Sequence, residues 1–113
     1  AKVKEKLPNT PIVLHGASSV IPRLVEMCNE NGGNIPGAKG CPNEMLKQAG
    51  ENGVSKINVD TDLRLAMTAQ VRRVFNEDPS IFDPRKYLGA ARAEIKETVS
   101  DKINNVFCSA NKA

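Results

Sequence analysis

The stretch PIVLHGASS, residues 11–19, places a short apolar run directly before the chain's single histidine, which a turn of small residues follows. The apolar residues of this run are consecutive rather than alternating, which is typical of a strand covered on both faces, as in a parallel sheet. A second short run, VSKINV at residues 54–59, has helical patterns on either side. Strands joined by helical crossovers predict an α/β protein with a parallel sheet.

Helical signals fill the remaining segments. We expect a basic helix over residues 2–7, a helix ending at Asn31-Gly32-Gly33, a short helix from about residue 42 to Gly50 or Gly53, a helix over 61–76, and one from Phe82-Asp83-Pro84 to about Val106. Apolar positions at helical spacing predict three buried faces: Ile21, Leu24, Val25 and Cys28; Leu63, Met67, Val71 and Val74; and Leu88, Ala91, Ile95, Val99 and Ile103.

Length and charge narrow the class of protein. A chain of 113 residues suits one domain, and 16 basic against 13 acidic residues give a net charge of +3. The basic residues are scattered and there are only three Phe, one Tyr and no Trp, so nucleic acid is not the expected partner, whereas a small anion fits. With no leader-like start and no apolar run of about 18 residues, we expect no membrane partner and a cytoplasmic location.

The cysteines carry no metal-site pattern. Cys28, Cys41 and Cys108 are widely spaced, and the chain has only one histidine with which to complete a zinc site. We expect three reduced, packed side chains.

Two strands cannot make a stable sheet by themselves, because each edge exposes unpaired N–H and C=O groups. We therefore expect the chain to be part of a larger fold, and expect the isolated segment to associate through its exposed strand edges and helix faces.

Polar and small residues follow both predicted strands. If the strands are parallel, residues 15–19 and 58–62 meet at the carboxyl edge, where α/β proteins bind ligands. Gly16 lets the backbone approach a ligand, and Ser18 with the next N–H groups suits a phosphate. The residues alone leave another interpretation open, with His15 as a hydrogen-bonded ring, Ser18 or Ser19 as the N-cap of one helix, and Asp60 or Thr61 as the N-cap of the next.

Two motifs, in the same order along this chain as in a known family, help to choose between a ligand site and a purely structural role for these residues. KINVDTDLRLAMTAQVRRVF, residues 56–75, together with PIVLHGASSV, residues 11–20, resembles the class II fructose-1,6-bisphosphate aldolases. FDPRKYLGAARAEIKE, residues 82–97, and the long insert between the strands resemble the class IIB-type branch. The resemblance covers nearly the whole chain, but it does not separate fructose-bisphosphate from tagatose-bisphosphate aldolases.

The resemblance implies the C-terminal part of a (β/α)8 TIM barrel. Residues from about 1 to 78 would supply the seventh and eighth strands with their helices, and residues from about 79 to 113 a helical extension. The full-length enzyme would be a zinc-dependent lyase of glycolysis and gluconeogenesis, cleaving fructose 1,6-bisphosphate reversibly to dihydroxyacetone phosphate and glyceraldehyde 3-phosphate. It would form a homo-oligomer, a dimer or tetramer.

The resemblance also assigns roles to residues at both strand ends. His15 matches a zinc ligand, and Gly16, Ala17 and Ser18 match the loop that holds the phosphate of dihydroxyacetone phosphate, where a backbone carbonyl also suits Na⁺ or K⁺. Asn58 matches the residue at the enediolate, Val59, Asp60 and Thr61 match positions around substrate hydroxyl and phosphate groups, and Arg64 matches an arginine that reaches the second phosphate in the neighbouring subunit's site.

The chain departs from that family in size. A barrel of this kind takes about 250 residues and a catalytic zinc normally has three protein ligands, whereas this sequence has 113 residues and one histidine. No residue matches the catalytic acid. We therefore expect the 113 residues alone to be inactive as an aldolase. A non-catalytic phosphate-binding or interaction fragment is the alternative from another functional class.

Overall fold

The computed structural model describes residues 2–37 and 39–112 and contains the expected succession of helices and strands. The elements are α1 (Lys2–Lys6), β1 (Ile12–Leu14), α2 (Pro22–Glu30), α3 (Asn43–Glu51), β2 (Val54–Ile57), α4 (Thr61–Glu77), α5 (Pro84–Asp101) and the π-helix η1 (Lys102–Val106). The prediction of an α/β chain with helices between and after two strands is confirmed.

The two strands pair in parallel, as the sequence predicts. Val13 pairs with Lys56 and Leu14 with Ile57, with an irregularity in the ladder before Val13. Both strands are shorter than their apolar runs, so His15, Asn58 and Val59 lie just past the strand ends. The sheet thus delivers both polar segments to one edge.

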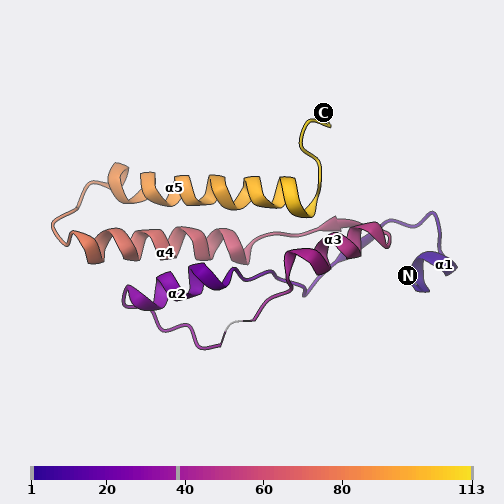
Figure 1. The fold of residues 1–113 in the computed structure, drawn as a ribbon, viewed down its shortest axis with the longest axis horizontal. Helices are drawn as coiled ribbons and strands as arrows, with labels where there is room; N and C mark the ends of the chain where they lie inside the picture. The colour runs from indigo at the N-terminus through magenta and orange to yellow at the C-terminus, as the bar shows by residue number, and fades with distance from the viewer. Residues whose placement is uncertain (1, 38, 113) are drawn as a thin grey trace.

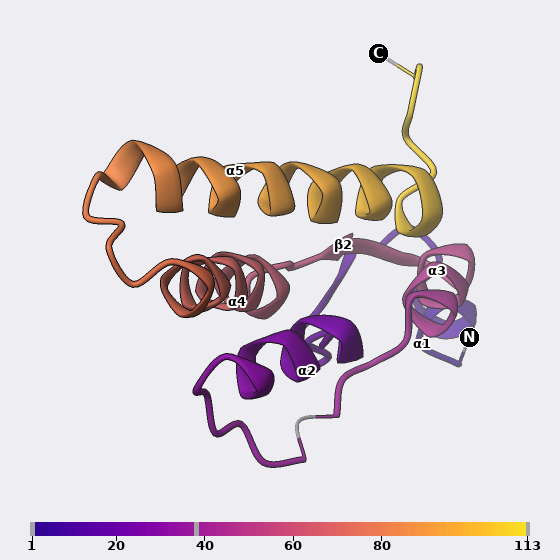
Figure 2. The same ribbon diagram turned by 60° about the vertical axis from the view of Figure 1, so that its left-hand side comes forward.

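Three helices form a layered stack beside this sheet. Figure 1 shows α4 between α2 and α5, with α5 running back along α4, and Figure 2 shows the same order from another side. The core lies between α2 and α4, where Leu24 and Cys28 pack against Leu65, Ala66 and Ala69. At the other end of the molecule, α3 packs against β2 and η1. The result is an elongated body of 59 × 34 × 17 Å.

The buried face of α2 agrees with its predicted stripe, but that of α4 does not. Leu24 and Cys28 are fully buried. In α4 the buried residues are Asp62, Leu65, Ala66, Ala69 and Gln70, whereas the predicted Met67 is 44% exposed. The small side chains of Ala66 and Ala69 allow α2 to pack closely against this face of α4. The face with the alanines is therefore buried, and the one with the larger Met67 is not.

The predicted buried face of α5 is also wrong in part. Ala91 is buried and Ile95 packs against the core, but Leu88, Val99 and Ile103 are exposed. Polar side chains take their place, and the buried set on this helix and its continuation is Ala91, Glu94, Thr98, Lys102 and Val106. The face of α5 and η1 toward the rest of the chain therefore holds ionic and polar contacts that hydrophobic periodicity does not detect.

None of the helices in the described residues combines the length and the apolar character needed to cross a lipid bilayer. Cys28 belongs to the core, and Cys41 and Cys108 are half-buried.

Candidate functional site

The first feature of the site is the adjacency of two strand ends. Because Leu14 pairs with Ile57, the next residues, His15 and Asn58, leave the sheet at the same edge. Both are exposed. We call residues 15–21, between β1 and α2, the first rim loop, and residues 58–61, from the end of β2 to the first residue of α4, the second rim loop. Parallel pairing therefore brings together the two polar segments that the sequence singled out.

The first rim loop turns immediately after the histidine. Gly16 has φ +75°, in the left-handed region that favours glycine, and it is exposed. Ala17 is half-buried and Ser18 is exposed. The Ser18 carbonyl accepts a hydrogen bond from the Cys41 N–H at 3.0 Å, so the segment that follows α2 returns to support this loop.

The prediction that Ser18 or Ser19 caps α2 is wrong. The helix begins at Pro22, Ile21 occupies the N-cap position, and no side chain makes the cap hydrogen bond. The Ser19 hydroxyl instead donates to the carboxylate of Asp62 in α4. A buried carboxylate competes successfully for this hydroxyl, because an ionised acceptor forms a stronger hydrogen bond than a neutral one.

The second rim loop has a mostly exposed polar surface. Asn58 accepts a hydrogen bond from Lys56 Nζ at 2.5 Å, and Asp60 forms an ion pair with Arg64 at 2.9 Å. Asp60 does occupy the N-cap position of α4, but its side chain makes no cap hydrogen bond. Thr61 is the first helical residue and is exposed, while Val59 is half-buried. The exposed Asp60–Arg64 pair contributes little to stability, so both side chains remain available to a ligand.

The sequence interpretation places Asp62 in the polar segment 58–62 but does not predict that its side chain is buried. Its side chain is fully buried, accepts from the Ser19 hydroxyl and from the Ile21 N–H at 3.1 Å, and pairs with Lys102 Nζ at 2.8 Å. An aspartate in the first turn of a helix ordinarily suits the helix dipole, so no local signal marks it as buried. Only the long-range partners give it this position.

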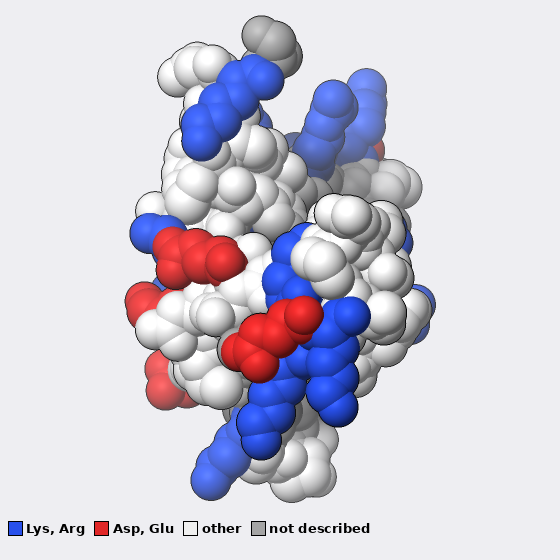
Figure 3. Space-filling model, turned by 90° about the vertical axis from the view of Figure 1, so that its right-hand side faces the viewer, with Lys and Arg blue, Asp and Glu red and all other residues white. Residues whose placement is uncertain are grey.

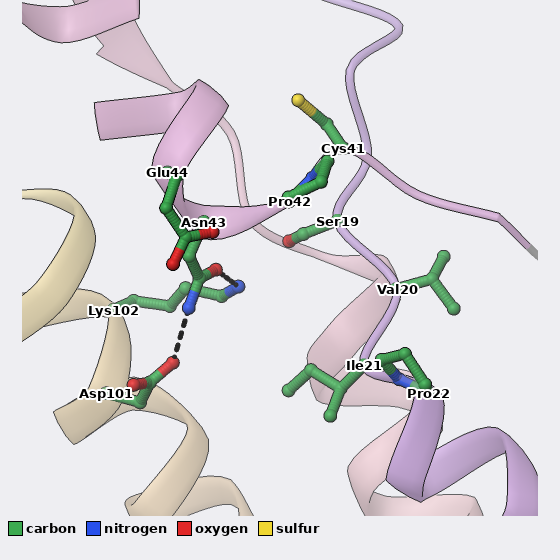
Figure 4. A pocket seen from close by; sticks show the side chains of 10 residues that line it. All are labelled: Ser19, Val20, Ile21, Pro22, Cys41, Pro42, Asn43, Glu44, Asp101 and Lys102. Carbon is green, nitrogen blue, oxygen red and sulfur yellow. Dashed lines mark hydrogen bonds between the residues drawn. The ribbon is translucent and has the colours of Figure 1, made fainter. Parts of the chain in front are cut away.

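A hollow of about 300 Å³ lies beside this buried pair. Figure 4 shows Asn43 pointing between Lys102 and Asp101, with Ser19 on the opposite wall. The lining residues are Ser19, Val20, Ile21, Pro22, Cys41, Pro42, Asn43, Glu44, Asp101 and Lys102. The polar side chains of Asn43, Asp101 and Lys102 are hydrogen-bonded to one another. This arrangement indicates a structural junction rather than a ligand pocket.

The described residues supply only part of a donor set for a zinc ion. The exposed His15 imidazole suits one zinc ligand, but residues 2–37 and 39–112 contain no group of three His, Cys, Asp or Glu side chains that could hold an ion. The described residues therefore fit zinc at a single position, and a complete site needs ligands from beyond them.

Basic side chains gather on part of the face at the α1 end. Figure 3 shows Lys and Arg side chains adjoining one another from the middle of this face to its lower edge, with Asp and Glu side chains beside them and broad neutral areas above. Basic residues that are scattered along the sequence therefore lie close together on this face.

Comparison with known proteins gives the family. The profile of the family described as "Fructose-bisphosphate aldolase class-II" matches residues 1–112. The chain is 47% identical over 113 residues to a fructose-bisphosphate aldolase of Treponema pallidum (strain Nichols), which spans all of this chain and 34% of the relative. It is 49% identical over 108 residues to one from Thermus caldophilus, covering 96% of this chain and 35% of the relative.

A third relative gives a similar match. The chain is 46% identical over 112 residues to a fructose-bisphosphate aldolase of Giardia intestinalis (strain ATCC 50803 / WB clone C6), covering 99% of this chain and 34% of the relative. The chain thus spans about a third of the length of these curated relatives, and it corresponds to their C-terminal part. With its profile match over nearly the whole length and its two motifs at adjacent strand ends, the chain belongs to the class II fructose-bisphosphate aldolase family, a family of lyases.

Proposed function

We propose that these residues form the C-terminal part of a (β/α)8 aldolase that reversibly cleaves fructose 1,6-bisphosphate to dihydroxyacetone phosphate and glyceraldehyde 3-phosphate. In this proposal residues from about 1 to 78 supply the last two barrel strands with their helices, and residues from about 79 to 113 form the extension. The family membership supports the reaction class, and the parallel β1–β2 pair is compatible with two neighbouring strands of such a barrel.

The observation that carries the proposal is the adjacency of His15 and Asn58, which follow the paired residues Leu14 and Ile57. His15 would hold zinc together with ligands from the rest of the protein. When bound, zinc supplies a Lewis acid for the ketone carbonyl of the substrate. The Asn58 amide is then suited to orient the enediolate that remains after the C–C bond breaks, because a preorganised donor beside developing charge stabilises it.

The rim loops would hold the parts of the substrate that do not react. The backbone around Gly16, Ala17 and Ser18 is suited to the phosphate of dihydroxyacetone phosphate, and a carbonyl of that loop to Na⁺ or K⁺. Binding this remote phosphate positions the bond that is cleaved. Val59, Asp60 and Thr61 would line the substrate on the second rim loop.

Arg64 is proposed to act across a subunit interface. Its guanidinium is exposed on α4 and is held only by the exposed Asp60 within the described residues. In a homo-oligomer it would reach the second phosphate in the neighbouring subunit's site. A cytoplasmic location belongs to the same proposal.

The test is an assay of the whole protein that carries this segment, loaded with zinc, beside the 113 residues alone. We expect the whole protein to cleave fructose 1,6-bisphosphate, its His15→Ala variant to lose both bound zinc and activity, and the isolated segment to be inactive. Cleavage of tagatose 1,6-bisphosphate in preference would reassign the substrate. An intact mass near 12.2 kDa for the protein in its source, without cleavage activity, would overturn the proposal in favour of a non-catalytic phosphate-binding fragment.

A further inference from the structure

The Asp62–Lys102 ion pair is the most deeply buried charged contact in the described residues. The distance from Oδ2 to Nζ is 2.8 Å, and the side chains are 0% and 2% exposed. Removing two charges from water is unfavourable, and the attraction between them offsets this cost only when further hydrogen bonds satisfy the remaining polar atoms. Such a pair stabilises the fold no more than apolar side chains of similar size would. Stability alone therefore does not explain why charged residues occupy these positions, and their contacts must be considered.

The Asp62 carboxylate joins the two rim loops. Its Oδ1 accepts the Ile21 N–H at 3.1 Å, and its Oδ2 accepts the Ser19 hydroxyl as well as the Lys102 ammonium. Ser19 and Ile21 end the first rim loop, and Asp62 follows the second one directly. One side chain therefore fixes where the backbone after His15 lies relative to the backbone after Asn58.

Lys102 in turn ties this junction to the end of the chain. It donates to Asn43 Oδ1 at 2.7 Å, while Asn43 Nδ2 donates to Asp101 at 2.8 Å, as Figure 4 shows. Lys102 is the first residue of η1, where the α-helical pattern of α5 gives way to a π-helix and the Phe107 N–H bonds back to the Lys102 carbonyl. The Lys102 ammonium is thus held by Asn43 at the start of α3 as well as by Asp62.

From these contacts we infer that Asp62 and Lys102 are positioning residues of the proposed aldolase site. They touch no proposed substrate position themselves. They act by holding the first rim loop, with its proposed phosphate-binding Gly16 and Ser18, in register with Asp60 and Thr61 on the second. The inference rests on the proposed function and gives the C-terminal extension a role in it.

The experiment uses the whole protein and three variants of the pair, Lys102→Met, Asp62→Asn and the double variant. A single change leaves one buried charge unpaired and should lower the unfolding temperature sharply, whereas the neutral double variant should recover most of it. The double variant still lacks a carboxylate able to accept from both rim loops. We therefore expect its KM for fructose 1,6-bisphosphate and its inhibition constant for inorganic phosphate to stay about tenfold or more above wild type, with zinc content unchanged.

Glu94→Gln is the matched control. Glu94 is also a buried carboxylate of the helical stack, paired with Arg23, but it contacts neither rim loop. Its variant should lose stability with KM unchanged. Recovery of KM together with the unfolding temperature in the double variant would mean that the pair acts through stability alone, and the inference would be overturned.

A milder variant and a second measurement keep the inference testable if the single changes prevent folding. Ser19→Ala retains the ion pair and removes only the hydroxyl that links the first rim loop to Asp62. It should fold and still raise KM, and an unchanged KM would contradict the inference. Backbone hydrogen exchange over residues 16–20 and 59–62 should become faster in the double variant but not in Glu94→Gln. Because exchange needs no catalysis, it separates a failure of this inference from an inactive wild-type protein, which would instead contradict the proposed function.

Discussion

The backbone of Gly40 lies directly against that of Val20. A Cβ built on Gly40 would be 2.2 Å from the Val20 nitrogen and 2.7 Å from the Ser19 carbonyl carbon. The Cys41 N–H, on the next residue, bonds to the Ser18 carbonyl. The glycine-rich segment after α2 is therefore the outer support of the first rim loop, and it requires a residue without a side chain at this contact.

Gly40→Ala should accordingly destabilise the whole protein by about 3 kcal/mol, because the new methyl group must displace backbone rather than a flexible side chain. Chemical denaturation at equilibrium measures this change. Gly89→Ala provides the control, since Gly89 lies in α5 with open space where its Cβ would be, and alanine there should stabilise the helix by up to about 1 kcal/mol. Equal effects of the two substitutions would show that the Gly40–Val20 contact relaxes at little cost.

Glu94 should make stability depend on pH in the acid range. Burial raises the pKa of Glu94, but hydrogen bonds donated by Arg23 and Gln70 and the attraction of Arg23 and Arg73 outweigh it, so that the pKa lies below its ordinary value of 4.5. Because the pKa is lower in the folded state, the contribution of Glu94 to the free energy of unfolding is fully present above about pH 4.5. It is lost as the pH falls through the lower, folded-state value.

Urea denaturation from pH 7 downward tests this expectation. Wild type should lose more stability between pH 5 and pH 3 than Glu94→Gln does, because the variant has no carboxylate to protonate at this position. Glu97→Gln removes the same charge from an exposed position of α5 and controls for net charge. Parallel pH profiles for wild type and Glu94→Gln would contradict the assigned role of the buried carboxylate.

The hydroxyl of Thr98 is buried in α5 with no hydrogen-bond partner among the described residues. Thr98→Val replaces it with a methyl group of nearly the same shape and removes an unsatisfied polar atom. We expect the free energy of unfolding to rise by about 1 kcal/mol. Thr68→Val, at an exposed position of α4, should change it by less than about 0.5 kcal/mol. A clear loss of stability in Thr98→Val would show that the hydroxyl has a partner elsewhere in the whole protein.

The sequence predicts the strands, the helices and the common edge, because these depend on local signals. Short apolar runs predict the strands, and glycine and proline mark where the helices end. Strands joined by helical crossovers pair in parallel, which is enough to predict that His15 and Asn58 lie at the same edge. The buried faces of α4 and α5 are different, because they depend on distant partners. Glu94 is buried because Arg23, 71 residues away in the chain, lies opposite it, and Asp62 is buried because Ser19 and Lys102 meet it. Hydrophobic periodicity contains no information about such pairs.

The roles proposed for the two strand ends predict different losses when each is removed from the whole protein. Asn58→Ala should keep its zinc and lower kcat on the order of 10²- to 10³-fold, because the variant lacks a donor that acts mainly on the developing charge. His15→Ala should lose zinc, so that added metal no longer restores activity. Zinc content measured beside steady-state kinetics separates the two effects.

Asn9→Ala makes the same chemical change before the amino end of β1, opposite the proposed site, and should leave both zinc content and kcat at wild-type values. The comparison depends on the pairing of Leu14 with Ile57, which brings His15 and Asn58 to one edge of the sheet. If Asn58→Ala lost zinc as fully as His15→Ala, Asn58 would act on the metal or on the fold of the edge. If it kept full kcat, the amide would not contact the intermediate, and the assignment of the second rim loop to the reacting carbon atoms would be wrong.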